Sequence, residues 1–259
     1  MSSSTWTPAA LSSEARPLSG VCWRLVEAQH HVSTLKLVDS LGEQQLLEDL
    51  IEDSKPPVPP ECRHLHYLLS TPFRYGTAYP NGSRFRRAGL TDGVFYAVDV
   101  PATAVAELAF HRLLFFAESP ETPWPRNPAA YTAFATAYAT GKAIDLTKGR
   151  FKVRAPAWSL LTDYSDCQVL ADTARVAPID IIRYASVRDP TGGINLALLT
   201  CRVFTGREPV ALQTWRIHLR DTGVQAICEA PRSRIAFDRT TFAGDPRIAG
   251  LNWNRTRAR

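Results

Sequence analysis

The hydrophobic pattern at the start of the chain predicts one strand followed by one helix. Leu18 to Val26 (LSGVCWRLV) is short, apolar and rich in β-branched and aromatic residues, as buried strands are, and Arg24 is its one charge. In Thr34 to Ile51 the apolar positions recur at helical spacing, chiefly after Gly42. A charge inside a buried strand needs a partner or a cleft, so Arg24 either lines a cavity or faces water at the strand end.

The middle of the chain predicts a strand that leads directly into a helix. Gly93 to Val100 (GVFYAVDV) reads as a strand, and Pro101 is suited to the start of a helix over Ala102 to Ala117. At helical spacing Glu107 and His111 lie one turn apart, away from the apolar side formed by Val105, Leu108, Ala109 and Phe116. Glu107 is therefore either an ordinary exposed acid or part of a cleft wall.

Further helices and strands follow along the chain. The alanine-rich stretch Tyr131 to Ala143 predicts a helix, and Asp166 to Ala177 predicts a second one with an aspartate cap. The remaining patterns predict strands at Ile179 to Tyr184, Ile194 to Leu199, Ala211 to Leu219 and Val224 to Ile227, the last two forming an antiparallel hairpin. Together these elements predict an α+β fold: one mixed-sheet domain with flanking helices.

Composition refines this organisation. With 259 residues, 45% of them hydrophobic, the chain can bury a large core. We expect a loose N-terminal arm over 1–20, a main domain over 21–230 with a helical insertion near 34–70, and a basic C-terminal extension over 231–259. The segment Lys55 to Glu61 (KPPVPPE) is a stiff proline-rich joint inside that insertion.

The sequence also predicts the compartment. No basic and apolar leader and no membrane-spanning run is present, and the five cysteines form no CxxC pair. Reduced thiols in the cytoplasm are the simplest interpretation. The net charge of +5 comes without a helix-turn-helix or zinc-finger spacing, so we do not expect direct nucleic-acid binding. Cys62, His64 and His66 lack the second paired group of a zinc site, and we expect no metal.

The strongest candidate chemistry lies in Gly82 to Arg87 (GSRFRR). Its arginines, among them Arg84, can offer guanidinium forks to phosphate oxygens, although a solvated basic turn fits the same composition. Neither a P-loop nor a Rossmann fingerprint is present. Ser186 has no GxSxG elbow around it, so positioning a substrate group suits it better than acting as a nucleophile.

Several separated segments together resemble the RES-domain family, named for an arginine, a glutamate and a serine. The matching stretches are WRLVEA at Arg24, GSRFRRAG at Arg84, GVFYAVDVPATAVAELAFHR with Tyr96 and Glu107, and YASVRDPTGGINLALL with Ser186 and Asn195. The interval between Arg24 and the Arg84 loop is longer than the family usually has, so Arg24 and Arg74 are both candidates for the first arginine. Phe85-Arg86 replaces the family's usual aromatic-asparagine pair.

The resemblance implies a fold similar to ADP-ribosyltransferases and an activity that consumes NAD as substrate rather than as cofactor. Known members include toxins of toxin–antitoxin pairs that cleave the nicotinamide glycosidic bond by hydrolysis or phosphorolysis. It implies Glu107, Arg84 and Tyr96 as catalytic residues, with Arg24, Arg74, Ser186 and Asn195 binding substrate. It also implies an Xre-type antitoxin as partner and inorganic phosphate as one of the acceptors to consider.

Two other functions fit the same residues. An ADP-ribosyltransferase would use them to modify a macromolecule, and a catalytically silent module would use the basic loop alone to bind a partner. Loss of the biological effect in Glu107→Ala would favour the enzyme, whereas loss only on charge reversal at Arg84, Arg86 and Arg87 would favour the module.

Overall fold

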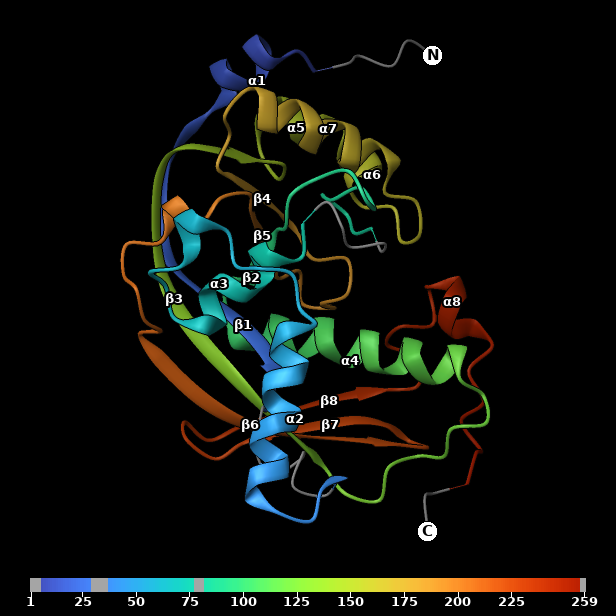
Figure 1. Cartoon of the computed structure of the whole chain (residues 1–259). Helices are drawn as coiled ribbons and strands as arrows, with labels where there is room; N and C mark the ends of the chain where they lie inside the picture. The colour runs from blue at the N-terminus through green and yellow to red at the C-terminus, as the bar shows by residue number, and fades with distance from the viewer. Residues whose placement is uncertain (1–5, 29–36, 77–81, 257–259) are drawn as a thin grey trace.

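The computed structural model describes residues 6–28, 37–76 and 82–256, and it forms one α+β domain built on a mixed sheet with flanking helices (Figure 1). This is the predicted fold class. The strands are β1 (Arg16–Glu27), β2 (Phe95–Val98), β3 (Ala129–Asp145), β4 (Ile181–Ala185), β5 (Ile194–Leu198), β6 (Ala211–Arg220), β7 (Gly223–Cys228) and β8 (Ser233–Asp238).

Helices flank the sheet along its length. The α-helices are α1 (Pro8–Glu14), α2 (Leu41–Asp53), α3 (Tyr67–Arg74), α4 (Pro101–Glu118), α5 (Gly149–Val153), α6 (Ala155–Trp158), α7 (Ser165–Val176) and α8 (Pro246–Ala249), with 3₁₀ turns η2 (Pro60–Cys62) and η3 (Cys201–Val203). Helix α4 begins with a proline in its first turn, where no backbone N–H is needed. Figure 1 shows α4 between the β6–β8 meander and the shorter strands β2, β4 and β5.

The sheet closes partly on itself. Its order is β1-β2-β5-β4-β3-β6-β7-β8, and β1 also pairs with β3 over a long antiparallel register from Arg16↔Ala143 to Glu27↔Tyr131. The strands β1, β2, β5, β4 and β3 therefore form a closed ring, and β6 to β8 extend from β3 as a meander. The end of β3 pairs with β4 in parallel, whereas every other pairing is antiparallel.

The predicted helix over Tyr131 to Ala143 is wrong, because these residues form most of β3. In a strand alternate residues share a face, so the Thr and aromatic residues from Thr132 to Thr140 lie on one side and the alanines from Ala133 to Ala139 on the other. The small alanine face allows close packing inside the sheet. Pairing with β1 on one side and with β6 or β4 on the other overrides the helix propensity of alanine.

Both ends of the chain are folded where the structure describes them. In the expected loose arm, residues 8–14 form α1 and β1 begins at Arg16, with residues 1–5 outside the described part. In the basic C-terminal extension, residues 233–238 add β8 to the sheet and 246–249 form α8, with residues 257–259 outside the described part. Much of both segments is thus part of the domain.

The other predicted elements are present in the structure, with some differences at their ends. The predicted aspartate cap is wrong, because α7 begins at Ser165, Asp166 lies inside it, and its N-cap residue Tyr164 makes no side-chain capping hydrogen bond. The helix expected from Thr34 is α2, which begins at Leu41, and residues 29–36 lie outside the described part. The predicted hairpin is β6 and β7, joined through the Arg220↔Gly223 pair. The helical insertion contains α2, η2 and α3, whose packing against β2 and η3 contributes to the hydrophobic core at Leu69 and Phe73.

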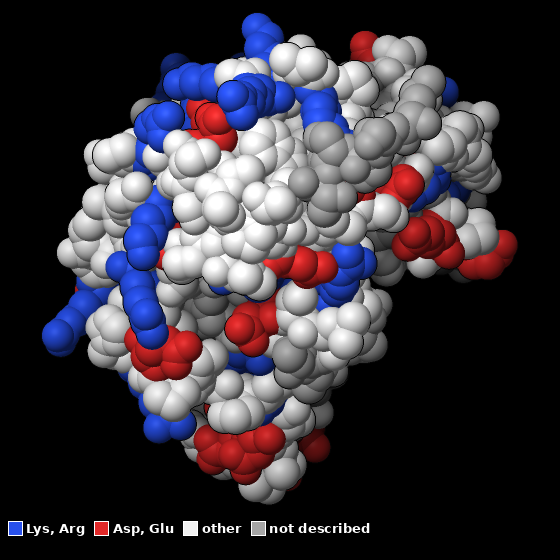
Figure 2. Space-filling view, turned by 90° about the horizontal axis from the view of Figure 1, so that it is seen from above, with Lys and Arg blue, Asp and Glu red and all other residues white. Residues whose placement is uncertain are grey.

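The surface carries charges of both signs. Figure 2, which views the molecule from above Figure 1, shows Lys and Arg side chains together with Asp and Glu side chains on this face. Among the described residues no helix is long and apolar enough to cross a bilayer. In the same part of the chain no three His, Cys, Asp or Glu side chains are grouped so that they could hold a metal ion.

Candidate active site

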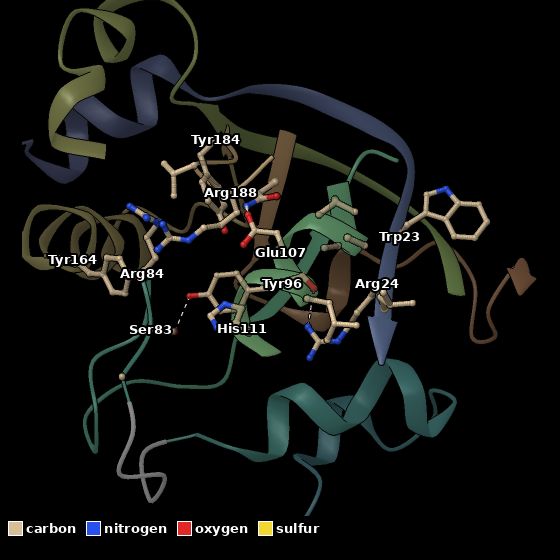
Figure 3. Close-up of a pocket in the computed structure, with 18 of the residues that line it drawn as sticks. Trp23, Arg24, Ser83, Arg84, Tyr96, Glu107, His111, Tyr164, Tyr184 and Arg188 are labelled. Carbon is tan, nitrogen blue, oxygen red and sulfur yellow. Dashed lines mark hydrogen bonds between the residues drawn. The ribbon is translucent and has the colours of Figure 1, made fainter. Parts of the chain in front are cut away.

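A cavity of about 470 Å³ opens where β1, β2, α4 and the loop around Arg84 meet. Most of its polar lining comes from segments far apart in the sequence. The titratable or amide side chains at its wall are Arg24, Arg84, Tyr96, Glu107, His111, Tyr164, Tyr184, Arg188, Asn195 and Arg247. Figure 3 shows Glu107 near the middle of this group, with Arg24 on one side and Arg84 and Arg188 on the other.

The carboxylate of Glu107 is held by two hydrogen bonds to one of its oxygens. Ser186 Oγ donates to Glu107 Oε1 at 2.7 Å, and Asn195 Nδ2 donates to the same oxygen at 2.6 Å. Asn195 pairs with Tyr184 in the β4–β5 ladder, and Ser186 follows the last residue of β4, so the register brings both donors to one place. The structure thus brings together Glu107, Ser186 and Asn195, three of the predicted site residues.

Ser186 acts on Glu107 and on its own loop rather than lining the cavity. Its hydroxyl oxygen also accepts hydrogen bonds from the backbone N–H groups of Arg188 (3.1 Å) and Asp189 (3.0 Å). Thr103 on α4 donates to Asp189 at 2.7 Å, which joins the start of the helix to the same loop. The orientation of Glu107 therefore depends on a loop that is fixed to α4 at two points.

Asn195 offers one further group. Its Oδ1 atom is buried and has no hydrogen-bond partner among the described residues. A buried unpaired acceptor is costly unless a ligand or water satisfies it. Asn195 itself lines the cavity.

Arg24 lies in the cavity wall, as the charge in a buried strand suggested. Its Nη1 atom donates to the Tyr96 carbonyl at 2.7 Å, and its guanidinium lies 5.3 Å from the centre of the Phe95 ring. Burial lowers the pKa of Arg24 to about 10, which leaves it charged at neutral pH. No described carboxylate lies within ion-pair distance, so this positive charge is suited to an anionic ligand.

Arg74, the other candidate for the first arginine, does not line the cavity. Its Nη1 atom lies 2.7 Å from Glu52 Oε1, and its Nε donates to the Pro56 carbonyl at 2.6 Å. These contacts tie the end of α3 to the end of α2 and the proline-rich joint. Of the two candidates the structure brings only Arg24 to Glu107's cavity.

Tyr96 fixes the Arg84 loop to β2. Its hydroxyl lies 2.8 Å from Ser83 Oγ and accepts a hydrogen bond from the Phe85 backbone N–H at 2.9 Å. Burial raises the pKa of Tyr96, partly offset by these hydrogen bonds, so the phenol stays protonated at neutral pH. The residue thus lines the cavity and also positions the neighbouring arginine loop.

The three arginines of the loop have different environments. Arg84 lines the cavity, with its guanidinium 4.5 Å from the centre of the Tyr164 ring. Arg87 forms an ion pair with Asp172 on α7 at 2.6 Å, and Arg86 is buried and donates to the Gly76 carbonyl at 3.3 Å. Residues 77–81, just before this loop, lie outside the described part.

Several wall residues were not assigned to a site by the sequence. His111 is an exposed residue that lines the cavity. Desolvation there lowers the pKa of its imidazole, and this effect outweighs the negative charge of Glu107, which acts to raise that pKa. Its helical spacing from Glu107 was the available signal. Arg188 lies within the quoted YASVRDPTGG stretch, whereas Arg247 comes from α8 and had no motif to indicate it.

The fold and cavity define an α+β protein in which one held carboxylate lies between arginines from distant segments. Residues 58–220, more than half of the chain, match the RES domain, and the protein belongs to the RES domain family. The match includes Arg84, Tyr96, Glu107, Ser186 and Asn195. Arg24 and Arg247 lie outside it.

The chain is also similar to a solved structure. This is a chain in the crystal structure of the M. tuberculosis MbcT-MbcA toxin-antitoxin complex, with a TM-score of 0.43 and 14% sequence identity. The alignment covers 92% of this chain and 97% of that chain. No curated protein matches the sequence.

Proposed function

We propose that this RES domain protein is an enzyme that consumes NAD by cleaving the bond between nicotinamide and ribose. The observation that carries the proposal is Glu107, whose carboxylate is fixed by Ser186 and Asn195 in a cavity between arginine side chains. A carboxylate held in this way can face a developing positive charge without having to reorganise.

The proposed reaction needs that kind of group. When the N-glycosidic bond breaks, its electron pair leaves with nicotinamide and positive charge develops on the ribose. An oxygen of water or phosphate then bonds to the same ribose carbon, giving ADP-ribose or its 1″-phosphate. Glu107 would stabilise the transition state or hold a ribose hydroxyl, and the fixed geometry would supply much of the rate enhancement.

The other cavity residues suit the remaining parts of NAD. Arg24 and Arg84 carry charges that would bind the pyrophosphate, because guanidinium forks match phosphate oxygens. The unpaired Oδ1 of Asn195 would accept a hydrogen bond from the nicotinamide amide or a ribose hydroxyl. Tyr96 would orient the nicotinamide end while holding the arginine loop.

For the biological role we propose the toxin of a toxin–antitoxin pair acting in the cytoplasm, with an Xre-type antitoxin that covers the cavity. This part rests on the family to which the chain belongs, whose known members include such toxins. Co-expression tests it directly: cells that express the protein alone should lose NAD and stop growing, and a matching antitoxin should restore both. Normal NAD levels in such cells would contradict the toxin role.

The enzyme proposal is tested by incubating the purified protein with NAD labelled in the adenosine part, with and without phosphate. Free ADP-ribose or ADP-ribose 1″-phosphate supports NAD cleavage and identifies the acceptor. Label retained on a protein would identify an ADP-ribosyltransferase instead. Intact NAD in every mixture would overturn both.

A further inference from the structure

Three arginines from distant parts of the chain converge on residues 158–161, at and just after the end of α6. Arg84 donates to the carbonyls of Trp158 and Leu160, at 2.7 and 3.0 Å. Arg188 and Arg247 both donate to the carbonyl of Leu161, at 3.0 and 2.9 Å. We refer to Arg84, Arg188 and Arg247 as the arginine cluster, and all three line the cavity.

One buried acid organises two members of this cluster. Asp245, which is 3% exposed, lies 2.8 Å from Arg188 through Oδ2 and accepts from Arg247 Nε at 3.0 Å and Nη2 at 2.9 Å. Both guanidinium groups also lie over the ring of Phe110 on α4, with that of Arg188 at 3.7 Å and that of Arg247 at 5.2 Å from the ring centre. Asp245 and Phe110 thus fix the directions in which the two arginines point.

The charges of the cluster do not balance within the protein. Among the described residues Asp245 is the only acid within ion-pair distance of any of the three guanidinium groups, and it pairs with Arg188 and Arg247. Glu107, in the wall of the same cavity, also acts on Arg188, so three positive charges face two negative charges. Each guanidinium has five N–H donors, and the bonds to carbonyls and to Asp245 occupy only part of them. An anion with several oxygens would balance this charge and accept the remaining hydrogen bonds.

We infer that the arginine cluster is a subsite for a pyrophosphate group and that Asp245 is a positioning residue for it. Asp245 and Arg247 lie outside the RES match of residues 58–220, so the C-terminal segment completes this cavity with residues beyond the matched domain. The inference deepens the proposed function, on which it rests for the identity of the whole ligand, a dinucleotide. The chemistry of the subsite itself requires only a pyrophosphate.

Calorimetric titration of the full-length protein with inorganic pyrophosphate, in a buffer without phosphate, tests the subsite. We expect binding in the wild type and about tenfold weaker binding in Arg247→Gln, because a hydrogen-bonded charge is lost. The matched control is Arg234→Gln, which removes an exposed charge on β8 outside the cavity wall and should bind as the wild type does. No binding in the wild type, or equal binding in all three proteins, would overturn the inference.

A positioning role of Asp245 and a purely electrostatic role predict opposite changes in pyrophosphate affinity when Asp245 is replaced. Asp245→Asn removes a negative charge beside the subsite, so general electrostatics alone would strengthen pyrophosphate binding. If Asp245 aims the two arginines, binding should weaken despite the more positive cavity. Equal or tighter binding in Asp245→Asn would show that Asp245 does not position the cluster.

A measurement on the unmodified sequence covers the case in which the variants fail to fold. Phenylglyoxal reacts with accessible arginines, and peptide mapping identifies the residues modified. Pyrophosphate should protect Arg247 and leave Arg234 reactive, whereas unchanged reactivity at Arg247 would contradict the subsite.

If pyrophosphate binds through Arg247 but NAD is never consumed, the inference stands and the proposed function fails. If NAD is consumed but pyrophosphate does not bind, the inference fails and the proposed function stands.

Discussion

Replacing Ser186 with alanine should loosen Glu107 and destabilise the loop after β4. The substitution removes the 2.7 Å hydrogen bond to the Glu107 carboxylate and leaves the buried N–H groups of Arg188 and Asp189 without their partner. A hydrogen bond to a charged group contributes about 1.5–3 kcal/mol, and an unpaired buried donor costs about 1–3 kcal/mol. Allowing for water in the vacated space, we expect a loss of about 2–4 kcal/mol in the free energy of unfolding.

The same change should lower NAD consumption without abolishing it, because Asn195 still holds Glu107 Oε1. If the variant loses about 1.5–3 kcal/mol of the transition-state stabilisation that an oriented Glu107 provides, kcat/KM falls about 10- to 100-fold. Nicotinamide release measures the rate, and urea unfolding measures the stability. The control Ser165→Ala removes an exposed hydroxyl that donates to Asp163 and should change stability by less than about 0.5 kcal/mol.

A double-mutant cycle separates positioning from general damage. If Ser186 works through Glu107, then adding Ser186→Ala to Glu107→Gln should cause no further loss of residual activity. An equal loss in both backgrounds would show that Ser186 affects the rate by another route. Wild-type rate and stability in Ser186→Ala would refute the reasoning altogether.

Three further changes test other parts of the account. Arg24→Met should raise KM for NAD about tenfold or more, since a charged donor is lost from the cavity wall; an unchanged KM would remove Arg24 from the site. Gly93→Ala should destabilise the fold by about 1–3 kcal/mol in urea unfolding, because its Cβ would lie 2.3 Å from the Pro72 carbonyl oxygen. Gly141→Ala, which meets nothing within 4 Å, is its control, and similar losses in both would contradict the packing argument. Burial raises the pKa of the Asp189 carboxyl, but hydrogen bonds from two threonines outweigh this effect and leave the pKa below the ordinary 3.8. The stability that these hydrogen bonds provide is present above the unfolded pKa and is lost as pH falls through the folded pKa. Asp189→Asn should therefore flatten the loss of stability below about pH 4 in urea unfolding, and an unchanged slope would contradict this role of Asp189.

The part of the site that the sequence could predict lies on single elements. Glu107 and His111 face the same side of a helix by spacing alone, and the charge of Arg24 inside an apolar strand already indicated a cleft. Ser186 and Asn195 entered through the family resemblance. Their common hydrogen-bond acceptor, Glu107 Oε1, depends on the β4–β5 register, which the sequence does not state.

The part that could not be predicted depends on contacts between distant segments. Arg247 reaches the cavity because α8 packs on α4 and Asp245 holds its side chain, and nothing near it in the sequence indicates this. Arg74 precedes the Arg84 loop in the chain, yet Glu52 from the insertion holds it elsewhere. In β3, alanine content favoured a helix, whereas the alternation of Thr and aromatic residues on one face with alanines on the other indicated the strand.

The central claim is that Glu107 acts on the nicotinamide glycosidic bond of NAD, and nicotinamide release by the wild type and Glu107→Gln tests it most directly. Both proteins should show the same far-UV circular dichroism and cooperative unfolding, so that any difference in rate reflects the carboxylate. We expect steady nicotinamide release from NAD by the wild type and a far slower release, only slightly above the uncatalysed background, from Glu107→Gln. Intact NAD with the wild type, or equal release by the folded variant, would contradict the account.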